Sequence, residues 1–174
     1  KYMCGIIGYT GPRRVVPVLL EGLRKLEYRG YDSAGLVYFL DGGLVKHRAP
    51  GKLEKLAAVV DEQIGVASFC GLGHTRWATH GIPSLDNAHP HSDCSGNLVV
   101  VHNGIIENYS TLRQELRARG HRFTSETDTE VLAHLIEEYL TDDLPAAVRA
   151  ALARVDGSYA IGVFWAGAPQ TLVA

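Results

Sequence analysis

The sequence predicts an α+β fold in which antiparallel sheets are covered by helices. Strand-like segments come in neighbouring pairs joined by short turns, and helix-like segments follow one another in blocks. Regular alternation of one strand with one helix, the pattern of a doubly wound parallel sheet, is absent. With 174 residues, 46% hydrophobic and 21% charged, the chain is long enough for one domain with a substantial core.

The first half of the chain begins with a short buried strand directly after Cys4. Apolar side chains then recur at helical spacing from Val15, and Pro17 fits only the first turn of that helix. Asp41-Gly42-Gly43 is typical of a hairpin turn. The elements expected here are a helix at 15–29, strands at 34–40 and 44–48, a helix at 53–60 and a strand at 66–73.

A long aperiodic stretch from His74 to Ser95 follows, which is typical of a binding loop or lid. Order returns with a buried strand at 97–102 that ends in a turn at Asn103-Gly104. Thr127 and Glu130 have the spacing of a capping box that opens a helix. The remaining elements expected are helices at 109–119, 131–139 and 144–155 and a hairpin formed by 157–165 and 170–173.

Charge and composition exclude several classes of partner. The net charge is −2 without long runs of one sign, which argues against nucleic acid and anionic membranes as partners. No apolar run approaches 18 residues and no signal-peptide pattern occurs, so we expect a soluble, cytoplasmic protein. The three cysteines have no framework spacing and are expected to be reduced. We interpret residues 1–3 as an extension that includes the initiator Met, and 4–174 as an incomplete domain.

Cys4 is the first candidate catalytic residue. A thiol needs a base or a lowered pKa to act as a nucleophile near neutrality. If the chain began at Cys4, its own α-amine, which titrates near pH ~7.7–8.0, would supply that base. The alternative is a small buried hydrophobe in an edge strand.

Three further polar groups are ambiguous when each is taken alone. Arg76 has a planar guanidinium group that can bind a carboxylate, and Trp77 has a bulky side chain that can cover a site. Alternatively, Arg76 forms a surface ion pair and Trp77 packs in the core. Asn103 and Gly104 can hold an oxyanion or form an ordinary turn. Asp128 can bind an ammonium group or complement a helix dipole.

A rival reading is a zinc site among loop histidines. The candidate ligands match none of the usual zinc spacings and lack a second pair, so we expect neither a metal nor any cofactor. Hydrogen-bonded loop histidines are the simpler interpretation. The residues concerned are His74, His80, His89, His91, Cys94 and His102.

Six segments together resemble one family: CGIIGYTG at the start, LEYRGYDSAG at 26–35, HTRWATHG at 74–81, NAHPHSD at 87–93, VVVHNGIIENY at 99–109 and SETDTEV at 125–131. They are similar to glutamine-dependent amidotransferases with an N-terminal nucleophile, and most of all to the glutaminase domain of glutamine–fructose-6-phosphate aminotransferases. The resemblance covers nearly the whole chain. It implies a four-layer αββα sandwich, truncated at its C-terminal end.

The resemblance also implies roles on one substrate, L-glutamine. Cys4 would form a γ-glutamyl thioester, and Asn103 with Gly104 would hold the oxyanion. Arg76 would bind the substrate carboxylate and Asp128 its ammonium group.

Further residues take supporting roles by the same resemblance. Trp77, Thr79 and His80 would belong to a loop that closes over glutamine, and Trp77 would guard the ammonia path. Arg29 and Gly30 would form a supporting turn beside the nucleophile. A C-terminal sugar isomerase domain, absent from this sequence, would be the partner and the dimerisation unit. A non-catalytic amino-acid sensor remains an alternative because three residues precede Cys4.

Overall fold

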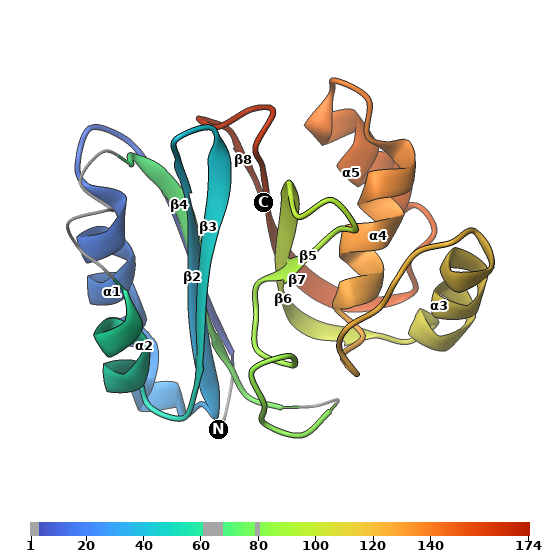
Figure 1. Ribbon diagram of the computed structural model, residues 1–174. Coiled ribbons are helices and arrows are strands. Elements are labelled where there is room, and N and C mark those ends of the chain that lie inside the picture. The colour runs from blue at the N-terminus through green and yellow to red at the C-terminus, as the bar shows by residue number, and fades with distance from the viewer. Residues whose placement is uncertain (1–3, 61–67, 79–80) are drawn as a thin grey trace.

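Two antiparallel sheets lie face to face at the centre of the molecule in the computed structural model, which describes residues 4–60, 68–78 and 81–174 (Figure 1). Every pair of neighbouring strands is antiparallel. The first sheet has the order β1 (Gly5–Thr10), β4 (Cys70–Arg76), β2 (Ser33–Leu40), β3 (Gly43–Pro50), and the second has the order β5 (His91–Ser92), β6 (Leu98–Ile106), β7 (Gly157–Trp165), β8 (Leu172–Val173).

Helices cover the outer face of each sheet and complete four layers (Figure 1). α1 (Val15–Leu26) and α2 (Leu53–Val59) cover the first sheet, and the 3₁₀ turn η1 (Glu27–Arg29) follows α1. α3 (Tyr109–Ala118), α4 (Glu130–Tyr139) and α5 (Leu144–Leu152) cover the second. The predicted α+β sandwich is confirmed. Within the described ranges, no helix is long and apolar enough to cross a membrane.

Three apolar clusters hold the layers together. One joins α1 and α2 to the first sheet, and a larger one joins α3, α4 and α5 to the second. A smaller cluster between the sheets includes Val37, Leu72, Val101 and Phe164. Because adjacent residues of a strand point to opposite faces, β6 serves two cores, with Val100 outward and Val101 inward.

Several local predictions are confirmed. The apolar stripe of α1 is buried from Val15 to Leu23, and Pro17 lies in the first turn. The β2–β3 turn has Asp41 at φ 48° and Gly42 at φ 89°, left-handed values that suit a two-residue hairpin turn. The helix expected from residue 144 begins at Leu144; its N-cap, which was not predicted, is Asp143, whose side chain accepts a hydrogen bond of 2.9 Å from the backbone N–H of Ala146.

Two expected boundaries are wrong in a way that affects the site. β4 continues to Arg76, so the aperiodic loop starts later than expected, and β5 interrupts it. β6 continues to Ile106, so Asn103-Gly104 is part of a strand and not a turn. Gly104 has φ 129°, and a Cβ there would lie 2.0 Å from the carbonyl oxygen of Ser158. Only glycine can keep the strand paired at this point.

The capping box is also wrong. α4 begins at Glu130, two residues later than a cap at Thr127 would place it, and its N-cap Thr129 makes no side-chain capping bond. The hydroxyl of Thr127 instead lies 3.0 Å from Nε2 of His91. The Glu130 carboxylate accepts hydrogen bonds from the preceding segment, including the backbone N–H of Ser125 at 2.7 Å. Asp128 therefore lies just before the helix.

Candidate active site

The predicted catalytic groups meet where both sheets end. Cys4 directly precedes β1, and the β1–β4 register pairs Gly5 with Thr75, which brings Cys4 beside Arg76. β6 of the facing sheet brings Asn103 and Gly104 to the same end. A small cavity of about 20 Å³ lies between them; it is lined by Cys4, Arg76, Trp77, His89, His102, Gly104, Thr127, Asp128 and Thr129.

The Cys4 sulfur accepts a hydrogen bond of 3.1 Å from the backbone N–H of Trp77. Burial raises the pKa of the thiol above its ordinary value, although the Trp77 N–H and the Arg76 cation both act to lower it. The neutral thiol therefore predominates at neutral pH. Such a thiol needs a base before it can act as a nucleophile.

The side-chain amide of Asn103 is held at both ends. Its Nδ2 donates to the carbonyl oxygen of Cys4 at 3.3 Å, and its Oδ1 lies 2.9 Å from Nε2 of His74. The same Nε2 lies 3.0 Å from the carbonyl oxygen of His102. Because a carbonyl oxygen only accepts, Nε2 of His74 carries the proton. Burial lowers the pKa of His74 to about 4, so the ring is neutral.

Two opposite charges line the cavity with the thiol. Arg76 is 4% exposed, donates to the carbonyl oxygen of Gly81 at 3.3 Å and lies 3.8 Å from Oδ1 of Asp32. Asp128 is 3% exposed, and its Oδ2 accepts a hydrogen bond of 2.9 Å from the backbone N–H of Ile106. Buried charges of both signs beside one thiol suit a ligand that carries both an ammonium and a carboxylate group.

The remaining predicted site residues are at the edge of the cavity, away from it or outside the described residues. Trp77 is 38% exposed at the edge of the cavity. Thr79 and His80 lie outside the described residues. Gly30 ends η1 at φ 74°, and the Arg29 side chain contacts the neighbouring Tyr28 ring. Neither of these two lines the described cavity, so their supporting role stays a prediction.

Sequence reasoning passed over Asp32, although it lies inside the quoted LEYRGYDSAG segment. Its carboxylate accepts hydrogen bonds from the backbone N–H of Ala78 and the hydroxyl of Ser33, besides facing Arg76. It therefore ties the start of the loop after β4 to the cation. The sequence feature that could have indicated its role is its position between Gly30 and the first residue of β2.

The histidines expected in a loop belong largely to the framework. His74 lies in β4 and His102 in β6, and both are buried. The rings of His74 and His89 stack with their centroids 4.2 Å apart, and Nδ1 of His102 lies 2.8 Å from the Thr129 hydroxyl. The expectation of hydrogen-bonded histidines is confirmed for those that the structure describes, and two of them, His89 and His102, line the cavity.

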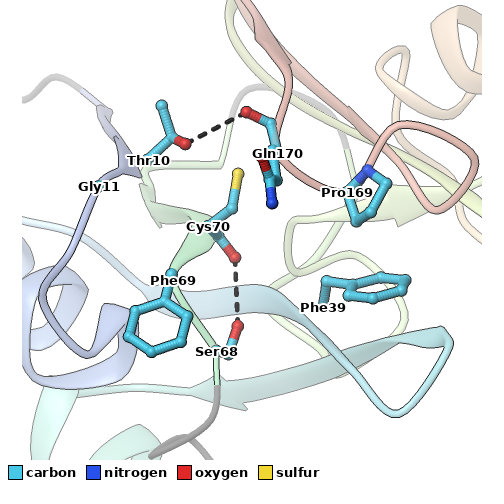
Figure 2. A pocket seen from close by; sticks show the side chains of 8 residues that line it. All are labelled: Thr10, Gly11, Phe39, Ser68, Phe69, Cys70, Pro169 and Gln170. Carbon is cyan, nitrogen blue, oxygen red and sulfur yellow. Dashed lines mark hydrogen bonds between the residues drawn. The ribbon is translucent and has the colours of Figure 1, made fainter.

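A larger cavity of about 440 Å³ lies near Thr10, which is the opposite end of β1 from Cys4 (Figure 2). Figure 2 shows Cys70 beside Gln170, with a 3.2 Å hydrogen bond from the Thr10 hydroxyl to the Gln170 carbonyl oxygen. Burial raises the pKa of the Cys70 thiol, and none of the described residues that line this cavity has a charged side chain. A reactive thiol needs an electropositive setting, so the smaller cavity is the better candidate.

Comparison with known proteins decides the family. The model of a family described as "Glutamine amidotransferase domain" matches residues 74–174, which is more than half of the chain. The chain belongs to this family. Two curated relatives named glutamine–fructose-6-phosphate aminotransferase [isomerizing] are similar over almost the whole chain. The protein of Pyrococcus horikoshii is 53% identical over 172 residues, and that of Thermus thermophilus is 55% identical over 161 residues.

This chain spans less than a third of the length of those relatives. The chain is covered to 98% and 92% in these two matches but spans only 29% and 26% of the relatives' own lengths. Among solved structures, the glutamine phosphoribosylpyrophosphate amidotransferase of B. subtilis superposes with a TM-score of 0.78 at 30% identity. That match covers 92% of this chain and 35% of the other. The four-layer sandwich of N-terminal-nucleophile hydrolases, predicted from the resemblance, is confirmed.

Proposed function

We propose that this domain hydrolyses the side-chain amide of L-glutamine and supplies the ammonia to a phosphosugar isomerase domain for the synthesis of glucosamine 6-phosphate from fructose 6-phosphate. The observation that carries the proposal is the cavity shared by the Cys4 thiol, the Arg76 cation and the Asp128 carboxylate. The names of the curated relatives support the choice of acceptor.

In the proposed reaction, the Cys4 sulfur attacks the side-chain carbonyl carbon of glutamine. A carbon–sulfur bond forms, and the carbonyl oxygen becomes an oxyanion held by Asn103 and Gly104. The carbon–nitrogen bond then breaks, the leaving nitrogen takes up the proton that the thiol gave to the base, and ammonia is released. Water attacks the γ-glutamyl thioester, which frees glutamate and restores the thiol.

Arg76 and Asp128 orient the substrate in this scheme. The guanidinium group binds the α-carboxylate, and the carboxylate of Asp128 binds the α-ammonium group. Both partners are almost fully buried, so the two ion pairs form with little screening by solvent. A ligand that lacks one of the two charges would lose one of these charge-assisted contacts and so bind more weakly.

The α-amine of Cys4 is the proposed base. Burial keeps the thiol protonated, so the base is required, and an α-amine titrates close to the working pH. In the printed sequence this nitrogen belongs to the Met3–Cys4 peptide bond and cannot accept a proton. We therefore propose that Lys1, Tyr2 and Met3 are removed before the domain is active.

Glutamine needs more room than the cavity provides. A volume of about 20 Å³ accommodates about one water molecule. Substrate entry must therefore widen the site, and the half-exposed indole of Trp77 is the large group at its edge. We propose that Trp77 moves to admit glutamine and afterwards separates ammonia from water. Thr79 and His80 are proposed to act in the same loop, and Arg29 with Gly30 to support the nucleophile.

Because the relatives are more than three times as long as this chain, the proposal includes an acceptor domain beyond it. We also propose a homodimer formed through that domain, as the family resemblance implies. No cofactor is proposed for glutamine hydrolysis, since the thiol, its amine and the oxyanion donors account for every proton and bond in the scheme.

The test is glutamate release from glutamine by the chain trimmed to begin at Cys4, compared with the untrimmed chain and with a trimmed variant in which Cys4 is replaced by serine. We expect turnover only in the trimmed wild type. Glutamine binding in calorimetry without turnover in any form would instead favour an amino-acid sensor. Equal turnover with residues 1–3 present would refute the amine as base.

A further inference from the structure

A second cluster of reactive side chains, none of which lines the cavity at Cys4, lies beside α4. Cys94 lies in the turn between β5 and β6, His121 follows α3, and His134 and Glu137 lie three residues apart on α4. Residues at this spacing share one helix face. One ligand atom from each of the four lies within 4.8 Å of the others.

The distances within this cluster match those of a coordination polyhedron. The two Nδ1 atoms of His121 and His134 are 3.3 Å apart, and the Cys94 sulfur lies 3.5 Å from each. For zinc bonds of about 2.0–2.1 Å to nitrogen and about 2.3 Å to sulfur, the edges of a tetrahedron are about 3.3 Å and about 3.6 Å. The Glu137 Oε2 atom completes the set at 3.0 Å and 3.2 Å from the two nitrogens.

Hydrogen bonds alone account poorly for this arrangement. Both Nδ1 atoms face the same Glu137 oxygen and each other, and the sulfur is equally far from both. With Nε2 of His121 donating to Glu138, the Nδ1 lone pair of His121 faces the Glu137 carboxylate, so that one acceptor faces another unless a cation lies between them. That is the environment of a bound cation.

Neighbouring groups hold the side chains of His121 and Glu137 in place through hydrogen bonds. Nε2 of His121 lies 2.8 Å from Oε1 of Glu138, so the ring can donate there and keep Nδ1 available to a metal. The backbone N–H of Cys94 donates to Oε2 of Glu137 at 3.2 Å and positions that carboxylate. Carboxylate partners on the far nitrogen of a ligating histidine are typical of zinc sites.

We propose that Cys94, His121, His134 and Glu137 bind one zinc ion as a structural site. Nitrogen, thiolate and carboxylate ligands suit Zn²⁺, and four protein ligands leave no position for a substrate. On binding, the Cys94 thiol releases its proton to solvent and a sulfur–zinc bond forms. The ion would link the β5–β6 turn, the segment after α3 and α4, and so fix residues 122–129, which carry Asp128.

The sequence gives little indication of this zinc site, because its four ligands are spread over 44 positions and do not form the closely spaced pairs that are typical of zinc motifs. In the sequence, Cys94 lies closest to the histidines of 74–102, which favours those as its partners. The structure instead groups Cys94 with His121 and His134, which lie 27 and 40 residues later in the chain.

The test measures metal content and does not depend on glutaminase activity. The full chain, its Cys94→Ala and His121→Ala variants and the matched thiol controls Cys70→Ala and Cys4→Ala are loaded with Zn²⁺, dialysed and analysed by mass spectrometry for metal. We expect about one zinc per chain in the wild type and both controls, and affinity at least about tenfold lower in both ligand variants.

Cobalt supplies the geometric readout. Co²⁺ loaded into the wild type is expected to show a thiolate-to-cobalt charge-transfer band and the intense visible bands of a tetrahedral site, both lost in Cys94→Ala. Zinc should raise the melting temperature of the wild type and leave that of Cys94→Ala unchanged. Zinc retention that is equal in Cys94→Ala and the wild type, or a Co²⁺ spectrum without the thiolate band, would overturn the proposal. Cys94 is exposed, so its variant is expected to fold, which circular dichroism checks.

Discussion

Nε2 of His74 lies 2.9 Å from Oδ1 of Asn103, and this contact determines which way the Asn103 amide faces. His74 holds the proton on Nε2 because its second partner is the carbonyl oxygen of His102. The amide oxygen of Asn103 must therefore face His74, and its NH₂ group faces Cys4. A neutral histidine on the facing sheet thus presents the proposed oxyanion donor to the nucleophile.

We predict that His74→Leu lowers kcat for glutamine hydrolysis by about tenfold to a hundredfold, with a smaller change in KM. Loss of one oxyanion donor costs about 10²–10³ in kcat, and a donor that is only misdirected should cost less. Steady-state kinetics of the trimmed chain measures both constants. His74→Gln, which keeps an N–H donor, should recover part of the activity.

The double variant separates positioning from general destabilisation. Added to Asn103→Ala, His74→Leu should cause little further loss of kcat, because the group that it orients is gone. Independent, multiplicative losses in the double variant would show that His74 does not act through Asn103.

We predict that Arg76→Gln and Asp128→Asn each lower kcat/KM for glutamine by about tenfold to a hundredfold, mainly through KM. Each change removes one charge-assisted contact to the substrate, typically worth about 1.5–3 kcal/mol. Asp142→Asn, on an exposed carboxylate that contacts only Thr141 in the described structure, is the matched control and should leave both constants unchanged. A fall in kcat at unchanged KM would contradict the assignment to substrate binding.

For Trp77→Ala, we predict nearly normal glutamate release but a clear loss of amino-sugar product when the domain is part of a full-length enzyme. The indole is 38% exposed, and its removal should uncover the site to water without removing a reacting group. Glutamate and amino-sugar formation are measured side by side. If both fall equally, Trp77 does not guard the ammonia.

We predict that the domain loses stability as the pH falls from about 6.5 towards 4. Burial lowers the folded-state pKa of His74 to about 4, whereas an unfolded histidine titrates near 6.5, so unfolding takes up protons in this range. The stability from this group is complete above pH ~6.5, and His74 alone accounts for about 3 kcal/mol at most. Urea unfolding at pH 7.5 and 5.0 measures the change.

His74→Gln is the control for this pH dependence. His89, stacked on His74, also has a pKa lowered by burial, whereas His134 acts oppositely: burial lowers its pKa, but hydrogen bonds to Glu130 and Glu137 raise it overall. The variant keeps these other groups, so its stability should depend less steeply on pH than that of the wild type. An identical pH dependence in both proteins would assign the effect to other groups.

Local pattern predicted most of the fold because the relevant interactions are local. The spacing of Val15 to Leu23 predicted α1, and Asp41-Gly42-Gly43 predicted the β2–β3 hairpin. It failed at Asn103-Gly104, where pairing with β7 extends the strand through a dipeptide that is a turn in most sequences. Long-range pairing of this kind cannot be deduced from the dipeptide itself.

The residues of the site also fall into those that the sequence predicted and those that it did not. Cys4, Arg76, Gly104 and Asp128 were predicted, and the structure places them around one cavity. Asp32 and the orienting contact of His74 were not predicted, because each depends on the register between strands that are far apart in sequence.

The most direct test treats the trimmed and untrimmed chains with a glutamine analogue that carries an electrophilic ketone in place of the amide, followed by peptide mapping of the adduct. We expect one adduct on Cys4, formed only in the chain that begins there and prevented by excess glutamine. Labelling of Cys70 or Cys94 instead, or equal labelling of Cys4 with Lys1–Met3 still attached, would contradict it.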